Sequence, residues 1–433
     1  MLNEFNFVNK GHSTTVAMNN YIPQKLSDRS RPSVVIVGAN FAGLKAAVSL
    51  PEKFRVTVVD PWPWFEFSPN IHELISGYKT PDSLRFAKET VISRSGHTLI
   101  PEPVSAIHPE KQIVITHSGA QLPYDYCILA LGGQSNTFNI KGADSHAMPF
   151  KSVDQCQAIS ERLEYLSKKK KPFSIVIAGG GFEGVEALGE ILRKYKTVKD
   201  IQIHIIEKQK RMMMDAPTDI DREIRRLCTP YLVAFHTGNT VKRVWKNSVD
   251  LADQTKIPSQ ITIWTGGAQP PKILYESNLS TAKDQWANVN TALQHVHYPN
   301  IFAAGDAAGM LVPLSKQAYH ALDMGKHAAL NILRLHAGKS LKDFKPSAKP
   351  MLVSFGDLDA FLIDKRVVFA GPALGLLKEA VFQLVMTQLD PSGILLKAIH
   401  TSGRASAAAI KLAFALPLSM ASLAALGRIR IVK

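Results

Sequence analysis

The sequence predicts an α/β fold, because one strand–turn–helix–strand pattern occurs twice along the chain. The first copy, residues 34–60, reads VVIVGANFAGLKAAVSLPEKFRVTVVD, and the second, residues 174–207, reads SIVIAGGGFEGVEALGEILRKYKTVKDIQIHIIE. Each copy has an apolar strand, a glycine turn, a helix and a second strand that ends at an acidic residue. Such a βαβ unit binds a dinucleotide, whose pyrophosphate faces the backbone N–H groups at the helix start. The two copies therefore predict two Rossmann-like domains.

The first copy departs from the GxGxxG fingerprint at one position. Gly38 and Gly43 occupy the outer glycine positions, whereas Asn40 replaces the middle glycine, where the backbone approaches the ligand closely. Asn tolerates unusual dihedrals better than most residues, so this weakens the signature without excluding a site. Asp60 ends the second strand, where a carboxylate can accept from both ribose hydroxyls. The alternative is an ordinary βαβ unit of a parallel sheet.

The second copy holds the complete fingerprint. Gly179, Gly181 and Gly184 lie between a β-branched strand and a helix. Glu207 ends the next strand, about 20 residues further on, where the fingerprint has its acidic residue. We expect Glu207 to accept a hydrogen bond from the ribose 2′-OH of NADH and to repel the 2′-phosphate of NADPH.

Three basic residues follow Glu207 and could soften this discrimination: Lys208, Lys210 and Arg211. NADH is therefore the expected cofactor of the second site, and NADPH remains possible. Two dinucleotide units in one chain suggest one bound redox cofactor and one exchangeable nucleotide.

Further strands also end in glycine turns. Residues 124–132 read YDYCILALG and end at Gly132, residues 261–267 read ITIWTGG, and residues 300–309 read NIFAAGDAAG and contain Asp306. Each nucleotide domain is expected to close with such a strand, which returns to its binding edge. Asp306 can accept from a cofactor hydroxyl, and it can also cap the following helix.

The composition limits the class of protein. With 433 residues, of which 45% are apolar and 20% charged, the chain is long enough for two to three globular domains. The 51 basic residues exceed the 36 acidic ones, and the net charge of +15 suggests an anionic partner. Cys127, Cys156 and Cys228 form no closely spaced pair, which argues against a disulfide framework and favours a reducing compartment. No metal site is predicted.

The C-terminal tail differs from the rest of the chain. Residues 394–433 hold no acidic residue, and basic side chains punctuate their apolar segments. The uncharged stretch 412–427, interrupted by Pro417, is too short to span a bilayer and fits an interfacial anchor on an anionic membrane. The alternative is a helix buried on the domain or in a homodimer. The expected location is peripheral, on the cytoplasmic side of a membrane, with a soluble cytoplasmic protein as the alternative.

The chain divides into six predicted parts, in which the second nucleotide domain is inserted in the first. They are a flexible leader (1–31), the first domain's first part (32–152), the second domain (153–288), the first domain's second part (289–340), a C-terminal interface region (341–393) and the tail (394–433).

Two segments remain open in role. The aromatic, proline-rich residues 61–77 either cover the first site as a packed loop or line the ligand cleft. Residues 313–335 are expected to carry a long helix with Tyr319, His320 and Asp323.

The order of the motifs resembles the flavoproteins with two dinucleotide-binding domains of the pyridine nucleotide-disulfide oxidoreductase superfamily. GANFAG, Asp60, ALGG, GGGFEGVE, Glu207, WTGG and AAGD follow one another within residues 33–390. Within this superfamily the chain looks like the type II NADH dehydrogenases and the apoptosis-inducing-factor-like NAD(P)H:quinone oxidoreductases. Residues 318–332, 344–356 and 376–382 are similar to the second of these branches.

The resemblance implies an α/β fold with FAD in the first Rossmann-like domain and NADH in the second, plus a C-terminal α+β region with a helical tail. It implies FAD contacts at Gly38, Asn40, Gly43, Asp60, Gly132 and Asp306, and NADH contacts at Gly179, Gly181, Gly184 and Glu207. It also implies two catalytic residues. Glu186 matches a carboxylate beside the nicotinamide–flavin stack, and Lys378 matches a lysine whose charge would stabilise the anionic reduced flavin.

The chain departs from the family pattern in two places. The quinone-site motif AQxAxQ of type II dehydrogenases reads AYHALD at residues 318–323, so both glutamines are absent. The paired cysteines that sulfide:quinone reductases need are also absent. We therefore expect an FAD-dependent enzyme that takes hydride from NADH and reduces a quinone or another small acceptor, without nucleic acid as a partner. Alternatives are a flavin oxidoreductase acting on a biosynthetic metabolite, and an NADH-sensing flavoprotein that binds polyanions.

Overall fold

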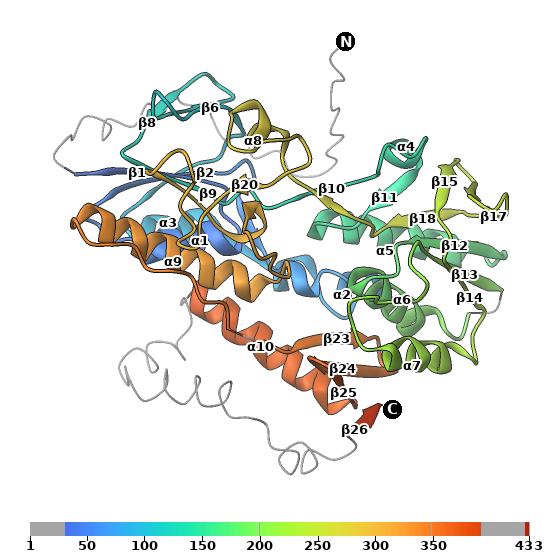
Figure 1. Ribbon diagram of the computed structural model, residues 1–433. Coiled ribbons are helices and arrows are strands. Elements are labelled where there is room, and N and C mark those ends of the chain that lie inside the picture. The colour runs from blue at the N-terminus through green and yellow to red at the C-terminus, as the bar shows by residue number, and fades with distance from the viewer. Residues whose placement is uncertain (1–30, 199, 348, 391–428, 433) are drawn as a thin grey trace.

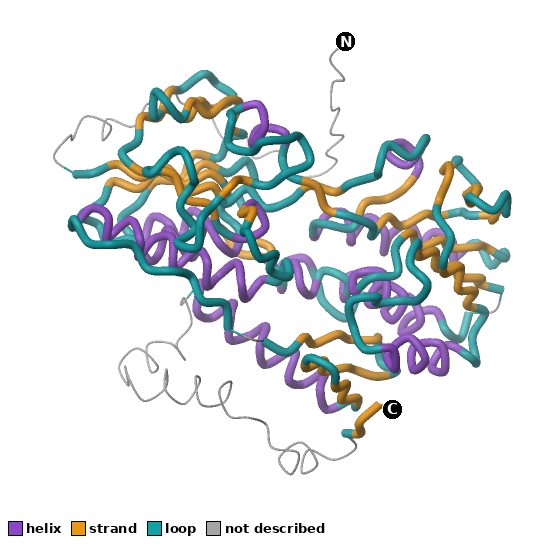
Figure 2. The backbone as a smooth tube through the Cα atoms, in the orientation of Figure 1, coloured by secondary structure: helices purple, strands orange, loops and turns teal. Residues whose placement is uncertain are grey.

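Two five-stranded parallel sheets form the centres of the two nucleotide-binding halves. The computed structural model describes residues 31–198, 200–347, 349–390 and 429–432. In Figure 1 the first sheet lies at the left, the second at the right, and the C-terminal helix α10 runs below them. Figure 2 shows the two groups of strands separated by loops and helices. The α/β fold with two Rossmann-like halves that the sequence predicts is confirmed.

The first sheet has the strand order β21-β9-β1-β2-β5. β1 and β2 pair in parallel from Ser33↔Arg55 to Val37↔Val59, so both end at the same edge. Helices α1 and α9 pack against each other beside this sheet (Figure 1). The strands are β1 (Ser33–Val37), β2 (Arg55–Val59), β5 (Thr98–Ile100), β9 (Tyr126–Leu129) and β21 (Ile301–Ala303), and the helices are α1 (Phe41–Ser49), α3 (Lys88–Arg94) and α9 (Ala318–His336).

The second sheet has the order β11-β18-β12-β13-β14, with every neighbouring pair parallel. β12 is buried along its whole length, which explains its unbroken apolar sequence. The strands are β11 (Ala147–Pro149), β12 (Phe173–Ala178), β13 (Ile201–Glu207), β14 (Val233–Thr237) and β18 (Ile261–Trp264), and the helices are α5 (Val153–Lys168), α6 (Phe182–Tyr195) and α7 (Thr218–Cys228). β21 follows the strands of this sheet in the chain, yet it pairs with β9 of the first sheet.

Smaller elements complete the two halves. Antiparallel sheets are formed by β6 (Val104–His108), β7 (Ile113–Thr116) and β8 (Gln121–Pro123), and by β15 (Val241–Val244), β16 (Ser248–Leu251) and β17 (Lys256–Pro258). Paired short strands are β3 (Trp64–Glu66) with β4 (Arg85–Ala87), β10 (Gln134–Ser135) with β19 (Ala268–Gln269), and β20 (Ala287–Asn288) with β22 (Ala308–Gly309). The short helices are α2 (Glu73–Ser76), α4 (Ala143–His146) and α8 (Lys272–Glu276).

The C-terminal region is an antiparallel sheet covered by a helix. It consists of β23 (Met351–Phe355), β24 (Asp359–Asp364), β25 (Val367–Ala370), β26 (Arg430–Val432) and α10 (Ala373–Leu389). Gly189 lets α6 approach this sheet, because a Cβ there would lie 2.6 Å from the backbone nitrogen of Gly356. This close approach brings the end of β23 next to α6.

The long helix expected within residues 313–335 begins only at Ala318, because Pro313–Gln317 form a loop beside a cavity. Arg430, in the last strand, bonds to Asp359 and Glu223 and ties this strand to β24 and α7. The stretch 412–427, expected to be an anchor, lies outside the described residues. Among the helices of the described ranges, none is both long and apolar enough to cross a membrane.

Candidate functional site

The first glycine turn packs tightly against the backbone that follows β9. Gly38 has φ +93°, and a Cβ there would lie 2.3 Å from the carbonyl oxygen of Ala130. Asn40 is the N-cap of α1, yet its side chain makes no capping bond. Its Oδ1 is buried and has no hydrogen-bond partner among the described residues. The backbone N–H groups at this helix start, and not the Asn40 oxygen, are the donors that fit a dinucleotide pyrophosphate.

Asp60 lies beside this turn and is held by three donors. Its Oδ2 accepts from the backbone N–H of Ala39 at 2.6 Å, and its Oδ1 accepts from the N–H of Trp62 at 2.8 Å. The ammonium of Lys88 lies 2.8 Å from Oδ1. Lys88 is buried, and this burial lowers its pKa although Asp60 acts to raise it. No motif around Lys88 indicates this contact.

The second turn repeats this construction around Glu207. One carboxylate oxygen accepts from the backbone N–H of Gly180 at 2.7 Å, and the other accepts from the N–H of Gln209 at 2.7 Å. Gly179 has φ +121°, and Gly184 sits against it, so the turn is as tight as the fingerprint requires. Glu207 thus stands at the edge where a ribose would lie.

Arg211 does not turn toward Glu207. Its guanidinium donates to the carbonyl oxygens of Met213 at 3.0 Å, Met214 at 2.6 Å and Ala216 at 2.7 Å. Arg211, one of the three basic residues after Glu207, is therefore hydrogen-bonded within its own loop. Its guanidinium is not free to bind a 2′-phosphate.

Gly132 and Asp306 follow β9 and β21, two neighbouring strands of the first sheet. Gly132 has φ +65°, and Asp306 lies in a single 3₁₀ turn after β21. Burial raises the pKa of Asp306, and the nearby charges of Lys316 and Lys151 act against this rise. The sheet thus brings both residues to the binding edge, as expected of parallel strands.

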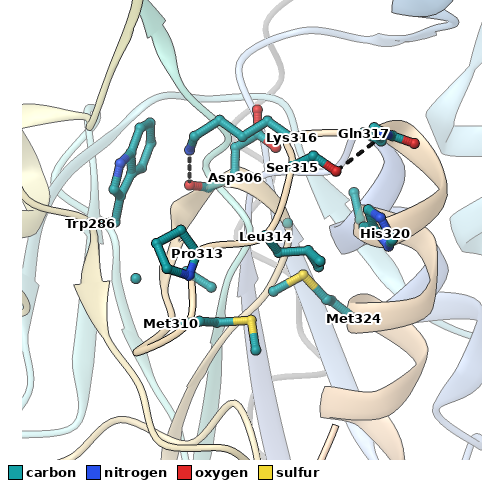
Figure 3. A pocket seen from close by; sticks show the side chains of 14 residues that line it. Trp286, Asp306, Met310, Pro313, Leu314, Ser315, Lys316, Gln317, His320 and Met324 are labelled. Atoms are coloured by element: carbon teal, nitrogen blue, oxygen red, sulfur yellow. Dashed lines mark hydrogen bonds between the residues drawn. The ribbon is translucent and has the colours of Figure 1, made fainter. Parts of the chain in front are cut away.

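A cavity of about 240 Å³ opens beside Asp306 (Figure 3). The ammonium of Lys316 lies over the ring of Trp286, 3.0 Å from its centroid, and donates to the backbone oxygen of Asp306 at 2.8 Å. Apolar side chains cover much of the wall, namely Met310, Pro313, Leu314 and Met324. His320 from α9 adds a polar group, and burial lowers its pKa.

Glu186 and Lys378, the two residues predicted to be catalytic, are in direct contact. Nζ of Lys378 on α10 lies 2.5 Å from Oε1 of Glu186 on α6. Ser354 joins them, since its backbone N–H donates to the same oxygen at 3.2 Å and its hydroxyl lies 3.0 Å from the lysine nitrogen. The pair therefore sits where the second domain meets the C-terminal region.

His72 completes this buried cluster. Its Nε2 lies 2.9 Å from the hydroxyl of Ser354 and 3.2 Å from the nitrogen of Lys378, and its Nδ1 lies 3.4 Å from Oε2 of Glu186. Burial, together with the charges of Lys378 and Arg193, lowers the pKa of His72 well below its usual value. The ring is therefore neutral at pH 7, and the segment 61–77 does contribute to the site.

Burial also raises the pKa of Glu186, while Lys378 acts to lower it. A carboxylate, an ammonium and a neutral imidazole thus share one dry, hydrogen-bonded site. In the described parts of the chain, no group of three or more His, Cys, Asp or Glu residues could hold a metal ion.

A comparison with protein families matches residues 32–325 to the pyridine nucleotide-disulphide oxidoreductases. The chain belongs to this family. It is therefore an oxidoreductase. It has no redox disulfide, because Cys127, Cys156 and Cys228 are all free and buried. Burial raises the pKa of each thiol, to about 12 for Cys228, so none is a reactive thiolate.

Curated members of this family that resemble the chain include type II NADH:quinone oxidoreductases. The protein of Staphylococcus aureus (strain MSSA476) is 24% identical over 414 residues, which cover 85% of this chain and 98% of that protein. The protein of Staphylococcus epidermidis (strain RP62A) is 24% identical over 405 residues, with the same coverage.

Solved structures share the fold. NDH2 of Plasmodium falciparum in complex with NADH has a TM-score of 0.73 at 18% identity, and the match covers 83% of this chain and 94% of that chain. The sulfide:quinone oxidoreductase of Aquifex aeolicus also has a TM-score of 0.73 at 18% identity, and the match covers 83% of this chain and 91% of that chain. The two-domain architecture is thus common to both.

Four residues around the site were missed in the sequence: His72, Lys88, Ser354 and Glu190, a buried acid on α6 one turn beyond Glu186. A buried ionisable residue inside an apolar segment is unusual and could have drawn attention to His72 and Glu190. Nothing local marks Lys88 or Ser354, which reach the site through tertiary contacts.

Proposed function

We propose that this oxidoreductase binds FAD at the first glycine turn and NADH at the second, and passes electrons from NADH to a quinone. The buried pair Glu186–Lys378 carries the proposal. It joins the helix that starts at the second glycine turn to the C-terminal helix α10, and it is enclosed by His72 from the first domain. Such a concentration of buried ionisable groups is typical of an active site.

The first turn supplies the features that a resident dinucleotide needs. The N–H of Gly38 donates to the carbonyl oxygen of Val59 and fixes the turn, and the backbone N–H groups at the start of α1 would face the pyrophosphate. Asp60 stands where the ribose hydroxyls would lie. Gly132 and Asp306 lie at the ends of neighbouring strands of the same sheet. Bound FAD would supply the two-electron carrier between the nicotinamide and the acceptor.

The second turn supplies the features of an exchangeable NADH site. Gly179, Gly181 and Gly184 form the complete fingerprint, and Glu207 makes no ion pair with a basic side chain in the described residues. Asp60, in contrast, is neutralised by Lys88. A carboxylate whose charge is not neutralised by a basic side chain repels a 2′-phosphate. We therefore infer that the second site prefers NADH over NADPH.

The chain's own groups would perform three tasks around the bound cofactors. The glycine turns orient the two nucleotides, and the packed cluster of Glu186, Ser354 and Lys378 excludes water from the site. The ammonium of Lys378 favours negative charge beside it, and Glu186 holds that ammonium in place.

The cavity beside Asp306 is the site that we assign to the acceptor. Its apolar wall of Met310, Leu314 and Met324 suits an aromatic ring, and His320 offers a polar contact to a carbonyl group. His320 stands within the segment 318–323, where the glutamines of the type II motif are absent, so the acceptor contacts differ from that motif. Peripheral binding to an anionic membrane, which rests on the composition of residues 394–433, would bring the cavity to a lipid-soluble quinone.

The experiment is a steady-state assay of NADH oxidation by the purified, FAD-loaded protein with a water-soluble short-chain quinone. Strong stimulation by the quinone over oxygen alone supports the proposal. His320→Ala should raise the KM for the quinone and leave flavin reduction by NADH unchanged. If NADH reduces the flavin but no quinone stimulates turnover, the acceptor is another small molecule and the quinone assignment is wrong.

A further inference from the structure

Glu190 is a buried acid that the proposed reaction has not used. It lies on α6 one turn beyond Glu186, and it is 0% exposed. One oxygen bonds to the hydroxyl of Ser76 and lies 3.3 Å from Nε of Arg193, whereas the other has no hydrogen-bond partner among the described residues. A buried carboxylate oxygen without a donor is costly, and protonation removes that cost.

The surroundings of Glu190 place its titration in the physiological range. Burial raises its pKa to about 7, while the bond from Ser76 and the charges of Arg193 and Lys378 act to lower it. Glu73 acts in the opposite direction and favours the protonated form. The acid can therefore gain and lose a proton near neutral pH.

The outer side of Glu190 leads to solvent. Ser76 is half-buried, and its hydroxyl accepts from the backbone N–H of Tyr78 at 3.2 Å. The ring of Tyr78 is 59% exposed and lies 4.3 Å from the guanidinium carbon of Arg193. A hydroxyl both donates and accepts, so Ser76 can pass a proton from surface water to Glu190.

The inner side of Glu190 faces the candidate active site. Residues four apart on a helix lie on the same face with Cβ atoms roughly 5–6 Å apart, so Glu186 and Glu190 are neighbours. Lys378, which bonds to Glu186, also acts on the pKa of Glu190.

The proposed reaction needs one proton from solvent. Hydride transfer from NADH delivers two electrons and one proton, whereas a quinone that becomes a quinol gains two electrons and two protons. The balance is NADH + H⁺ + quinone → NAD⁺ + quinol. Because His72, Ser354 and Lys378 are buried around Glu186, a proton that passes through this cluster needs a carrier from the surface.

We propose that Glu190 holds this solvent proton and delivers it to the Glu186–Lys378 pair. This relay rests on the proposed function, and it has two steps. An O–H bond forms on the Glu190 carboxylate, with a proton from surface water through Ser76. That bond breaks when the acceptor is reduced, and the proton passes to Glu186, which releases it on the path to the acceptor oxygen. Glu190 touches neither nucleotide site, so it is a positioning residue that acts through Glu186.

The test measures reoxidation of the NADH-reduced, FAD-loaded enzyme by a short-chain quinone in stopped flow, from pH 5.5 to 9. In the wild type the rate constant should fall as pH rises through about 7. Glu190→Gln should lower it by about tenfold at pH 6 and remove the pH dependence, so that the two proteins converge at pH 9. Flavin reduction by NADH should be the same in both. Glu276→Gln, an exposed acid on α8, is the matched control and should behave as the wild type.

Two further measurements keep the test decisive. Infrared difference spectra of the unreacted protein between pH 6 and pH 8 should contain the carbonyl stretch of a protonated carboxylic acid, and Glu190→Gln should lose it. Ser76→Ala keeps the acid but removes the outer hydroxyl, so it should slow reoxidation while keeping its pH dependence.

A folded, flavin-loaded Glu190→Gln protein with an unchanged pH profile overturns the relay alone. Absence of quinone turnover in the wild type overturns the proposed function and the relay with it.

Discussion

Nζ of Lys378 lies 2.5 Å from Oε1 of Glu186, although the two residues are 192 positions apart in the sequence. The side chains are 9% and 12% exposed, so the pair is largely dry. It joins α6 of the second domain to α10 of the C-terminal region. Removing one partner of such a pair leaves the other charge buried and uncompensated, which costs far more than the pair itself contributes.

Lys378→Met should therefore lower the free energy of unfolding by about 3–5 kcal/mol, because Glu186 would be left without its cation. Urea unfolding followed by circular dichroism measures this change. Lys196→Met is the matched control, since Lys196 also links α6 to the C-terminal sheet, but its pair with Asp357 is more exposed, at 28% and 44%. The control should lose less than about 1 kcal/mol. Equal losses in the two variants would contradict the claim that the buried pair needs both partners more than an exposed pair does.

Glu207→Ala should relax the choice between NADH and NADPH. The carboxylate would accept from the ribose hydroxyls, and a hydrogen bond to a charged group is worth about 1.5–3 kcal/mol, or roughly tenfold or more in affinity. We expect kcat/KM for NADH to fall by about that factor and kcat/KM for NADPH to rise. Rates of flavin reduction with each nucleotide measure the ratio. Unchanged selectivity would remove Glu207 from the ribose site.

Asn40→Gly should leave FAD binding as tight as in the wild type, or tighter. Asn40 makes no capping bond to α1, so its loss should cost only about a few tenths of a kcal/mol. Gly43→Ala is the contrasting control, because its Cβ would lie 1.8 Å from the carbonyl oxygen of Gly38 and would disrupt the turn. Titration of the apoprotein with FAD, followed by flavin fluorescence, gives both affinities. A large loss in Asn40→Gly would mean that the asparagine amide itself holds the cofactor.

Glu190 should make stability depend on pH. Its pKa in the folded protein is about 7, above the value of about 4.3 for an unperturbed Glu, so the folded state binds the proton more tightly. The resulting stability is fully present below about pH 4 and is lost as pH rises through 7. Glu190→Gln should thus unfold at a higher temperature than the wild type at pH 8.5, by an amount that shrinks toward pH 5. Parallel shifts at both pH values would show that Glu190 does not titrate.

Much of the fold was predictable because periodicity and glycine turns are local signals. The runs Val34–Val37 and Ile201–Ile206 are strands as their β-branched residues indicate, and each glycine turn follows its strand directly. The C-terminal region was predicted less completely. Only an α+β region was expected there. β25 pairs with β24 on one side and with Arg430–Val432 on the other, and this last strand lies more than 50 residues further along the chain.

Only those residues of the site that lie within motifs could be predicted from the sequence, because motifs are local signals. Residues within motifs carry their own context, so Glu186 could be named from GVE and Lys378 from LLKEAVF. His72, Ser354 and Glu190 belong to no motif. They gain their roles because α2, β23 and α6 converge, and such convergence is set by tertiary packing rather than by sequence neighbours.

Anaerobic addition of NADH to the purified protein, followed by visible spectroscopy, tests the central claim most directly. The account predicts that the protein carries the absorption bands of bound FAD and that about one equivalent of NADH bleaches them, because hydride transfer is a two-electron step. A protein that binds no flavin after reconstitution with FAD, or whose flavin spectrum does not change with NADH, would contradict it.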